Sequence, residues 1–203
     1  ASDYVITVLL LGVLRDAHRE APGVSIEFHQ PSTVAYEQLE AGEVDFVINP
    51  EPFAVATQSS CVLFEDTYHA VVDLANTEVG ESIPLAQYMA MHHVVFHNNG
   101  RPFFETWFDR THGEGRQADI LANSFNLLPS LVMGTSRVAT LHSRLARHAC
   151  LSQPVRMVPL AFDTPKLVET LQWHRFRDHD PGSQWLRELI LKHAQALPPL
   201  ADI

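Results

Sequence analysis

The sequence predicts an α/β protein in which helices alternate with short β-strands along the whole chain. Three observations support this class. Stretches with an apolar period near 3.6 residues alternate with short runs of β-branched and aromatic residues. Prolines, glycines and N-capping residues separate these stretches at close intervals. The pattern occurs twice, with a break near residues 68–81, and this predicts two α/β units joined by a hinge.

The first 50 residues predict the order helix, strand, helix, strand. Apolar residues recur at helical spacing over residues 4–20, after Ser2 and Asp3 in N-cap positions. Alternation predicts a strand over residues 24–28, and the following elements are a helix over 34–40, closed by Gly42, and a buried strand over 44–48. This order requires crossover connections and predicts a parallel sheet, in which a further strand is expected before the first helix.

The same criteria place the remaining elements. Strands are predicted over residues 61–64, 69–74, 94–96, 118–121, 138–141, 155–158 and 167–173. Helices are predicted over residues 84–91, 102–111, 124–133, 142–149 and 180–196. Ser124 and Asp180 stand in N-cap positions, and Pro102 and Pro181 stand in first turns.

Composition and charge exclude several classes of protein. The chain has 203 residues, of which 46% are hydrophobic and 19% charged, so wholesale disorder is excluded. Its 14 basic and 24 acidic residues give a formal charge of −10, so the chain by itself is a poor partner for nucleic acid or an acidic membrane. No apolar run is long enough to span a bilayer, and the N-terminal residues do not resemble a signal peptide.

The cysteines and histidines favour structural roles. Cys61 and Cys150 lack the spacing of a metal site or a disulfide framework, which indicates a reducing, cytoplasmic compartment. His92, His93 and His97 could bind a metal only from a helix, whereas the β-type residues between them favour a strand that points alternate side chains to opposite faces. The chain contains no GxSxG, P-loop, GxGxxG or HExxH motif, so we predict no enzyme activity, no metal and no cofactor.

The ordered motifs of the chain resemble the effector-binding domain of LysR-type transcriptional regulators. The similarity is greatest to the branch of nodulation-gene activators and of regulators of naphthalene, salicylate, nitroaromatic and chlorophenol breakdown. The matching segments are ASDYV at 1–5, EAPGVSIEF at 20–28, LEAGEVDFVI at 39–48, LFEDTYHAVV at 63–72, VATLHSRLA at 138–146 and WHRFRDHDPGSQWLREL at 173–189. The chain differs from the family pattern in lacking the winged helix-turn-helix, the linker helix and the first strand, and in having Asn76-Thr77-Glu78 where the family commonly has His-Pro.

The resemblance implies two Rossmann-like lobes with a hinge of two crossing strands, as in type 2 periplasmic binding proteins. Lobe I is expected to hold residues 1–70 and 170–203, and lobe II residues 71–169. The crossings are expected near Tyr68 and residues 170–173, with the effector in the cleft between the lobes.

Ten residues are candidates for ligand binding. Ser2 and Asp3 precede a helix whose free N–H groups favour an anionic or hydroxylated ligand, although simple capping is an alternative. Asp66 matches a ligand-facing position of the nitroaromatic-responsive relatives; it could accept a hydrogen bond from a phenol or pair with an arginine. The full set is Ser2, Asp3, Leu9, Asp66, Asn98, Arg101, Ser124, Arg144, Trp173 and His174.

The implied function is the sensing of a small aromatic effector, such as a phenol, by a transcriptional activator of a catabolic or symbiosis operon. The implied partners are a second copy of the chain in a homodimer or homotetramer, RNA polymerase, and promoter DNA through the missing N-terminal domain. No membrane partner is implied. A solute-binding protein of a transport system shares the architecture and is the alternative, against which the absence of a secretion signal argues.

Overall fold

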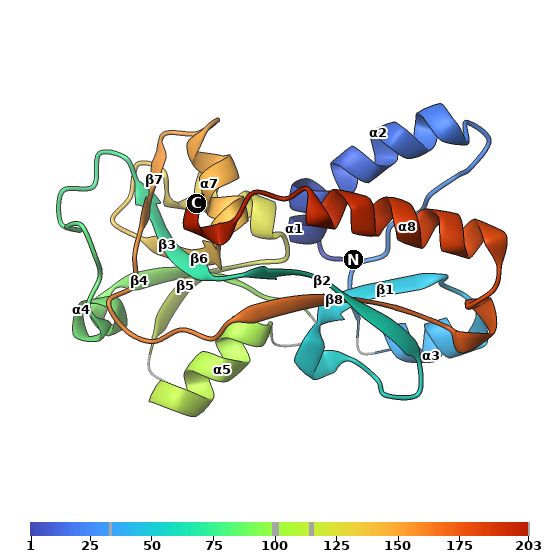
Figure 1. Cartoon of the computed structure of the whole chain (residues 1–203). Helices are drawn as coiled ribbons and strands as arrows, with labels where there is room; N and C mark the ends of the chain where they lie inside the picture. The colour runs from blue at the N-terminus through green and yellow to red at the C-terminus, as the bar shows by residue number, and fades with distance from the viewer. Residues whose placement is uncertain (33, 99–101, 114–115, 203) are drawn as a thin grey trace. The chain divides into compact units, whose positions relative to one another are not determined.

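The computed structural model of the chain describes residues 1–32, 34–98, 102–113 and 116–202. Contacts within the chain divide it into two compact units (Figure 1). Unit 1 comprises Ala1–Glu65 and Leu167–Asp202, and unit 2 comprises Asp66–Lys166. The sequence prediction places the corresponding boundaries after residues 70 and 169, a few residues further along the chain.

Unit 1 is built from both ends of the chain. Its helices are α1 (Asp3–Val5), a π-helical turn (Ile6–Leu10), α2 (Leu11–Glu20), α3 (Ala35–Ala41) and α8 (Pro181–Gln195), with short 3-10 turns at Glu51–Phe53, Arg175–Arg177 and Leu200–Asp202. Its strands are β1 (Phe46–Pro50), β2 (Ser59–Asp66, of which the last residue falls in unit 2) and β8 (Leu167–Trp173).

The sheet of unit 1 has the strand order β1-β8-β2. β1 runs antiparallel to β8, with Phe46 opposite Trp173 and Pro50 opposite Glu169. Helices α2 and α8 lie on one side of this sheet and α3 on the other (Figure 1). Leu39 of α3 and Val47 of β1 share a small buried core, so burial of apolar side chains holds α3 to the sheet.

Unit 2 is continuous in sequence. Its strands are β3 (Tyr68–Asp73), β4 (His92–Phe96), β5 (Gln117–Ala122), β6 (Val138–His142) and β7 (Val155–Val158). Its helices are α4 (Leu85–Ala90), α5 (Phe103–His112), a 3-10 turn (Phe125–Leu127) that leads into α6 (Leu128–Val132), and α7 (Ser143–Cys150).

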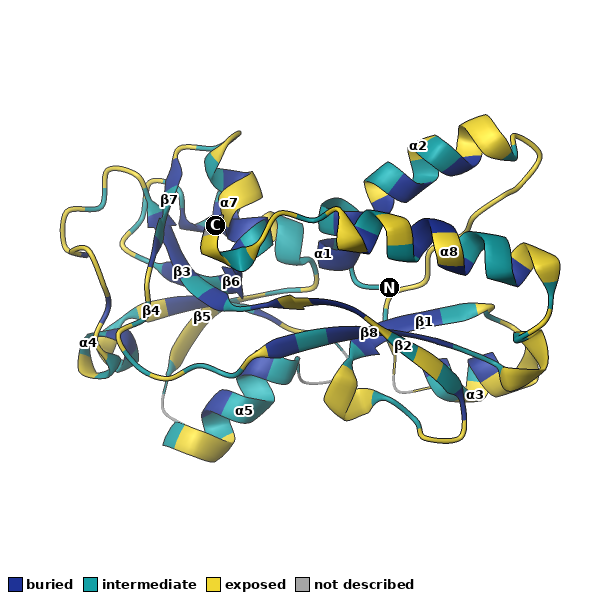
Figure 2. Ribbon diagram, in the orientation of Figure 1, coloured by how far each residue is buried: buried dark blue, intermediate teal, exposed yellow. Residues whose placement is uncertain are grey.

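The sheet of unit 2 has the order β5-β4-β6-β3-β7. β4 is parallel to both β5 and β6, whereas β3 is antiparallel to β6 and β7. The central strands carry buried apolar side chains such as Val71, Val94 and Leu141, which makes them the core of the unit (Figure 2). The α/β class is confirmed. Unit 2 contains parallel and antiparallel pairs, whereas in unit 1 β1 pairs antiparallel with β8, so the parallel sheet predicted from the first 50 residues is not formed there.

The strand predicted over residues 24–28 is also wrong, because this segment has no regular secondary structure. Its apolar side chains are largely exposed: Val24 is 50% exposed, Ile26 38% and Phe28 39%. A strand needs a hydrogen-bonding neighbour, and the described residues offer none to this segment. The alternation of apolar and polar residues over 24–28 therefore occurs without a neighbouring strand with which the segment could pair.

The other predicted elements are present with shifts of about two residues at most, apart from two changes inside helices. The first helix contains a π-helical turn, and the helix predicted over 124–133 begins as a 3-10 turn. The strands Val155–Val158 and Leu167–Trp173 have the predicted bounds. Cys61 and Cys150 are half-buried free thiols. Within the described ranges, no helix combines the length and the apolar character needed to cross a bilayer.

Gly42 ends α3 in the left-handed region, with φ of +74°, and its N–H donates to the Leu39 carbonyl at 3.2 Å. A Gly42→Ala substitution should lower the free energy of unfolding by about 1–2 kcal/mol, because an L side chain is strained at this φ. Gly23→Ala is the matched control, since neither a positive φ nor a neighbouring atom opposes a Cβ there. Urea unfolding measures both changes in the free energy of unfolding. Equal effects of the two substitutions would refute the role given to the left-handed conformation of Gly42.

Candidate functional site

Four of the predicted ligand residues gather at one edge of the unit 2 sheet. Asn98, Ser124 and Arg144 each lie two residues beyond the end of β4, β5 and β6. These neighbouring strands are parallel, so their carboxyl ends share one edge of the sheet, which is where α/β proteins place ligands. Asp66, the last residue of β2, reaches the same edge, because Tyr68 at the start of β3 pairs with His142 at the end of β6. We call Asp66, Asn98, Ser124 and Arg144 the polar edge.

Asp66 is fully buried at the start of α7. Its Oδ1 accepts a hydrogen bond from the Thr67 backbone N–H at 2.8 Å, and its Oδ2 accepts from the Arg144 backbone N–H at 3.4 Å. A carboxylate at a helix N-terminus is stabilised by the unpaired N–H groups and the helix dipole. Asp66 therefore holds α7 against β3, and any hydrogen bond to a ligand comes in addition to this role.

A chain of hydroxyl groups lies beside Asp66. The Thr67 and Ser143 hydroxyls are 2.7 Å apart, and the Ser143 hydroxyl lies 2.7 Å from Nδ1 of His69. The Ser143 N–H also donates to the Thr67 carbonyl at 2.9 Å. Burial lowers the pKa of His69. This edge thus combines a carboxylate with small hydroxyls and a neutral imidazole.

A continuous row of aromatic rings runs along the same edge. Adjacent ring centroids are 4.8 Å apart for Phe104 and Tyr68, 5.2 Å for Tyr68 and His142, 4.8 Å for His142 and Phe125, and 3.8 Å for Phe125 and Phe96. We call these five residues the aromatic row. Burial lowers the pKa of His142 to about 3, so its ring is neutral and can be counted with the apolar rings of the row.

Three predicted residues of unit 1 occupy the first helix. The Ser2 hydroxyl accepts from the Val5 N–H at 3.4 Å, and an Asp3 carboxylate oxygen accepts from its neighbour Tyr4 at 3.0 Å. Leu9 is 3% exposed and is part of the core. The structure therefore shows the capping roles of Ser2 and Asp3, and ligand contact by these three residues stays a prediction.

Trp173 and His174 lie at the end of β8 away from the first helix. Glu169 lies four residues earlier in β8 and is near the Ala1 amino group. Burial lowers the pKa of this amino group, and the charge of Glu169 offsets part of that lowering. The Trp173 indole N–H donates to Asp178 at 2.7 Å, and the Arg187 guanidinium lies 4.4 Å from its ring centroid. The structure does not bring Trp173 and His174 together with Ser2, Asp3 and Leu9. Arg101 lies outside the described residues.

His92 and His93 lie in strand β4, as the strand alternative for the histidine cluster predicted. His93 is buried and lies 2.8 Å from the Tyr88 carbonyl, whereas His92 is exposed and lies 2.9 Å from Asp119. Side chains of neighbouring residues point to opposite faces of a strand, so the two rings cannot share an ion. In the part of the chain that the structure describes, no group of three His, Cys, Asp or Glu side chains is arranged to hold a metal.

Sequence reasoning missed Tyr68, His69, Phe125, His142 and Ser143. Each is within three residues of a predicted position, so the neighbours of strand-end polar residues were the available signal. A cavity of about 540 Å³ in unit 1 was missed as well, and none of the nine described candidates lines it.

Comparison with protein families identifies the family to which this chain belongs. The family described as the LysR substrate binding domain matches residues 1–195. The chain belongs to the LysR substrate-binding domain family. Its fold is accordingly the α/β architecture of type 2 periplasmic binding proteins, and the family is not enzymatic.

Curated relatives of this LysR substrate-binding domain include nodulation proteins. The chain is 35% identical over 198 residues to nodulation protein D 2 of Rhizobium tropici and 36% identical over 204 residues to nodulation protein D 2 of Bradyrhizobium diazoefficiens. These alignments cover 97% and 100% of the chain but only 63% and 62% of the two relatives. The chain thus spans somewhat less than two thirds of their length.

Solved structures show the same fold. A probable transcriptional regulator of Pseudomonas aeruginosa matches with a TM-score of 0.84 and 20% identity, covering 95% of this chain and 64% of that one. The regulatory domain of MexT, a transcriptional activator of the same organism, matches with a TM-score of 0.80 and 23% identity, covering 95% and 96%. At these identities the structures support the fold of the LysR domain alone.

Proposed function

We propose that this LysR domain senses a small planar aromatic effector that carries a hydroxyl or carboxylate group, and that it does so for a transcription regulator. The observation that carries the proposal is the polar edge beside the aromatic row in unit 2. Ligand sites typically combine an apolar lining with a few convergent polar groups. Asp66, Asn98, Ser124 and Arg144 supply the polar groups, and the aromatic row places flat apolar rings beside them.

The charges of the polar edge favour a ligand with an acidic or hydroxylated rim. Arg144 carries a cation at the first turn of α7, and Ser124 and Asn98 offer neutral donors and acceptors. Asp66 can accept a hydrogen bond from a neutral phenol. Aromatic rings pack favourably edge-on or offset against one another, so the aromatic row suits a planar ring better than a sugar.

The proposal for the whole protein follows its relatives. We propose control of a symbiosis or catabolic operon as an activator in the cytoplasm, through promoter DNA bound by another part of the protein. Contact with RNA polymerase and assembly as a homodimer or homotetramer are parts of the same proposal. The nodulation proteins D support the regulator class at 35–36% identity.

A thermal-shift screen tests the effector class. Substituted phenols, salicylates and flavonoids are compared with amino acids and sugars on the purified chain. A ligand at about 100 times its dissociation constant stabilises the folded state by about 2.7 kcal/mol, so a true effector raises the melting temperature clearly. Binding of amino acids or sugars with no response to any aromatic compound would refute the proposal.

Asp66→Asn should shift the preference of the site from phenol to phenolate. In the wild type, the carboxylate accepts from the neutral phenol and repels the phenolate, so affinity for an acidic phenol falls as the pH rises through the phenol's pKa. Loss of this charged hydrogen bond should weaken binding of the neutral phenol by about 1.5–3 kcal/mol, or about 10- to 150-fold. Calorimetric titration from pH 5.5 to 8.5 measures both effects.

Asp73→Asn is the matched control. Asp73 lies at the opposite end of β3 and also accepts from backbone N–H groups, those of Gly134 at 2.6 Å and Ala75 at 2.8 Å. It should leave the affinity and its pH profile unchanged. If Asp66→Asn behaves like Asp73→Asn at every pH, Asp66 serves only to hold α7.

A further inference from the structure

The connection between β8 and α8 presents an exposed aromatic ring to solvent. Phe176 is 84% exposed, more than any other large apolar side chain in the described ranges. Single exposed apolar residues are common on protein surfaces, so the exposure of one ring is not by itself a sign of function. The neighbours of Phe176 give this exposure its significance.

Cationic side chains flank the Phe176 ring. The Arg175 guanidinium lies 5.8 Å from the ring centroid, and the centroid of the His174 ring lies at 4.8 Å. Arg175, Phe176 and Arg177 are all exposed. Aromatic and arginine side chains are the types enriched at the centres of protein interfaces. We call residues 174–177 the cationic turn.

The shape of the cationic turn is fixed by buried hydrogen bonds. The guanidinium of the buried Arg187 donates to the Arg177 carbonyl at 3.1 Å and to the Asp178 carbonyl at 2.8 Å. At the start of the turn, Nδ1 of His174 accepts from the Phe176 backbone N–H at 3.3 Å. A surface with a fixed backbone loses little conformational freedom when a partner binds.

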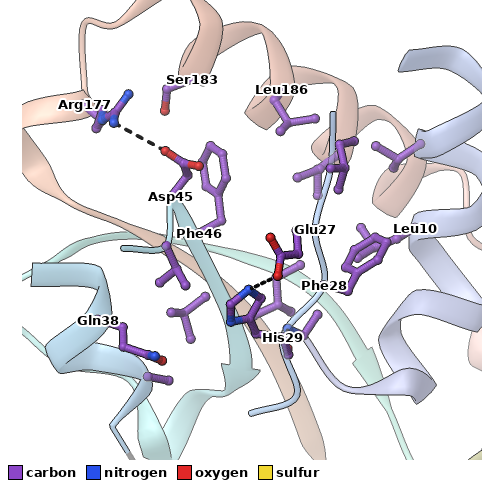
Figure 3. A pocket seen from close by; sticks show the side chains of 18 of the residues that line it. Leu10, Glu27, Phe28, His29, Gln38, Asp45, Phe46, Arg177, Ser183 and Leu186 are labelled. Carbon is purple, nitrogen blue, oxygen red and sulfur yellow. Dashed lines mark hydrogen bonds and ion pairs between the residues drawn. The ribbon is translucent and has the colours of Figure 1, made fainter. Parts of the chain in front are cut away.

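An acidic surface lies next to the cationic turn in unit 1. The chain has no lysine or arginine between Arg19 and Arg101. Within this stretch, α3 and the residues after it expose Glu37, Glu40 and Glu43, which we call the acidic face. The Arg177 guanidinium lies 3.4 Å from the carboxylate of Asp45, two residues beyond Glu43 (Figure 3). This ion pair marks the border between the two surfaces.

Adjacent surfaces of opposite charge are complementary to the same pair of surfaces on a second copy. In a two-fold dimer, each residue of the patch contacts the partner residue that contacts it in return. A two-fold rotation therefore places each cationic turn on the acidic face of the other copy. Val34 is 43% exposed and Ala41 is exposed, and both lie at helical spacing from Glu37, so the acidic face also offers apolar surface to Phe176.

We propose that the cationic turn and the acidic face form a two-fold contact between unit 1 of two copies of this chain. The proposal rests on the assembly given under the proposed function and names a surface for it. Nucleic acid fits the patch less well, because its phosphates would meet the acidic face and a chain of net charge −10. A stable interface uses about 20–30 residues on each side, so this small contact is weak and salt-dependent.

Exchange of charges across the contact tests the proposal. Arg175→Glu and Glu37→Arg each place like charges opposite one another, so each variant alone should self-associate about 10-fold more weakly or worse. In an equimolar mixture of the two variants, each new charge meets an opposite charge on the other chain, and association should recover. Sedimentation equilibrium at low salt measures the association constants of each variant and of the mixture.

Two further variants separate the contact from general effects. Phe176→Ser keeps every charge of the patch and should weaken self-association by a similar factor. Arg110→Glu makes the same charge change at an exposed position of α5 in unit 2 and should leave association unchanged. All four substitutions lie at exposed positions, so the melting temperature should stay within about 2 °C of the wild type and show that each variant is folded.

Three results would overturn the proposal. The first is a mixture of Arg175→Glu and Glu37→Arg that associates no better than either variant alone. The second is wild-type association that Phe176→Ser leaves unchanged, in which case the proposed assembly stands but uses another surface. The third is binding of duplex DNA that Phe176→Ser abolishes, which would assign the cationic turn to nucleic acid. Effector binding, measured separately by thermal shift, tests the proposed sensing function independently of all three.

Discussion

Arg116→Met should lower the free energy of unfolding by about 3–5 kcal/mol. The Arg116 side chain is 7% exposed and pairs with the half-buried Glu105. It also donates to the Tyr88 hydroxyl at 3.1 Å, and its guanidinium lies 4.2 Å from the Phe108 ring centroid. The substitution keeps the length of the side chain but removes the Arg116 cation from beside the Glu105 carboxylate, and loss of one partner of a buried charge pair is strongly destabilising.

Two further variants separate the charge from the packing. Arg116→Met combined with Glu105→Gln removes both charges and should recover much of the loss. Arg19→Met is the surface control, because Arg19 pairs with Asp16 while its side chain is 73% exposed, and it should cost about 1 kcal/mol or less. Chemical unfolding of the three proteins measures the series. A cost below about 1 kcal/mol for Arg116→Met would show that the pair is dispensable.

Mild acid should destabilise the domain well above the pH at which carboxylates titrate. Burial lowers the pKa of His93 to about 4 and that of His142 to about 3. The unfolded chain binds a proton at each histidine near pH 6.5, whereas the folded chain does not. The unfolding free energy is therefore highest above pH 6.5 and decreases as the pH falls from 6.5 toward 4.

Each of these histidines contributes a slope of up to about 1.4 kcal/mol per pH unit, so the pair contributes up to about 2.7 kcal/mol per unit. The carboxylates with lowered pKa values, those of Asp16, Asp73, Asp119 and Asp178, lose their stabilising effect mainly below about pH 5, as the pH falls toward and through their folded-state pKa values.

Urea unfolding at pH 7, 6 and 5 measures the slope. His93→Asn should reduce it by up to about 1.4 kcal/mol per unit. A wild-type stability that stays constant from pH 7 to 5 would contradict the prediction.

Local sequence predicted the elements that carry their own signals. Strand β8 is an apolar, β-branched run, and α8 begins where Asp180 accepts from the Ser183 N–H at 2.8 Å, as an N-cap does. Residues 24–28 carry an equally good strand pattern, but a strand also depends on a neighbour that local sequence does not reveal. The same limit explains why antiparallel pairing of β1 with β8 was missed.

The residues of the candidate site also fall into those that local sequence could predict and those that it could not. Asn98, Ser124 and Arg144 could be proposed because strand-end positions in an α/β chain share one edge. The aromatic row could not, because Tyr68, Phe96 and Phe125 are 28 or more positions apart and His142 lies 17 positions beyond Phe125; only Phe104 and Phe96, 8 positions apart, are near in sequence. Only the sheet order β5-β4-β6-β3 brings these rings together.

The central position of β8 in the unit 1 sheet has a consequence for the order of events during synthesis. β1 and β2 leave the ribosome early, but the strand between them is among the last to be made. The Thr170 hydroxyl donates to the Asn49 carbonyl at 3.0 Å across 121 residues of sequence. Unit 2 is complete at Lys166, so it can fold while unit 1 still lacks its middle strand. A ribosome stalled before residue 167 therefore holds a chain whose first 65 residues have no sheet to join.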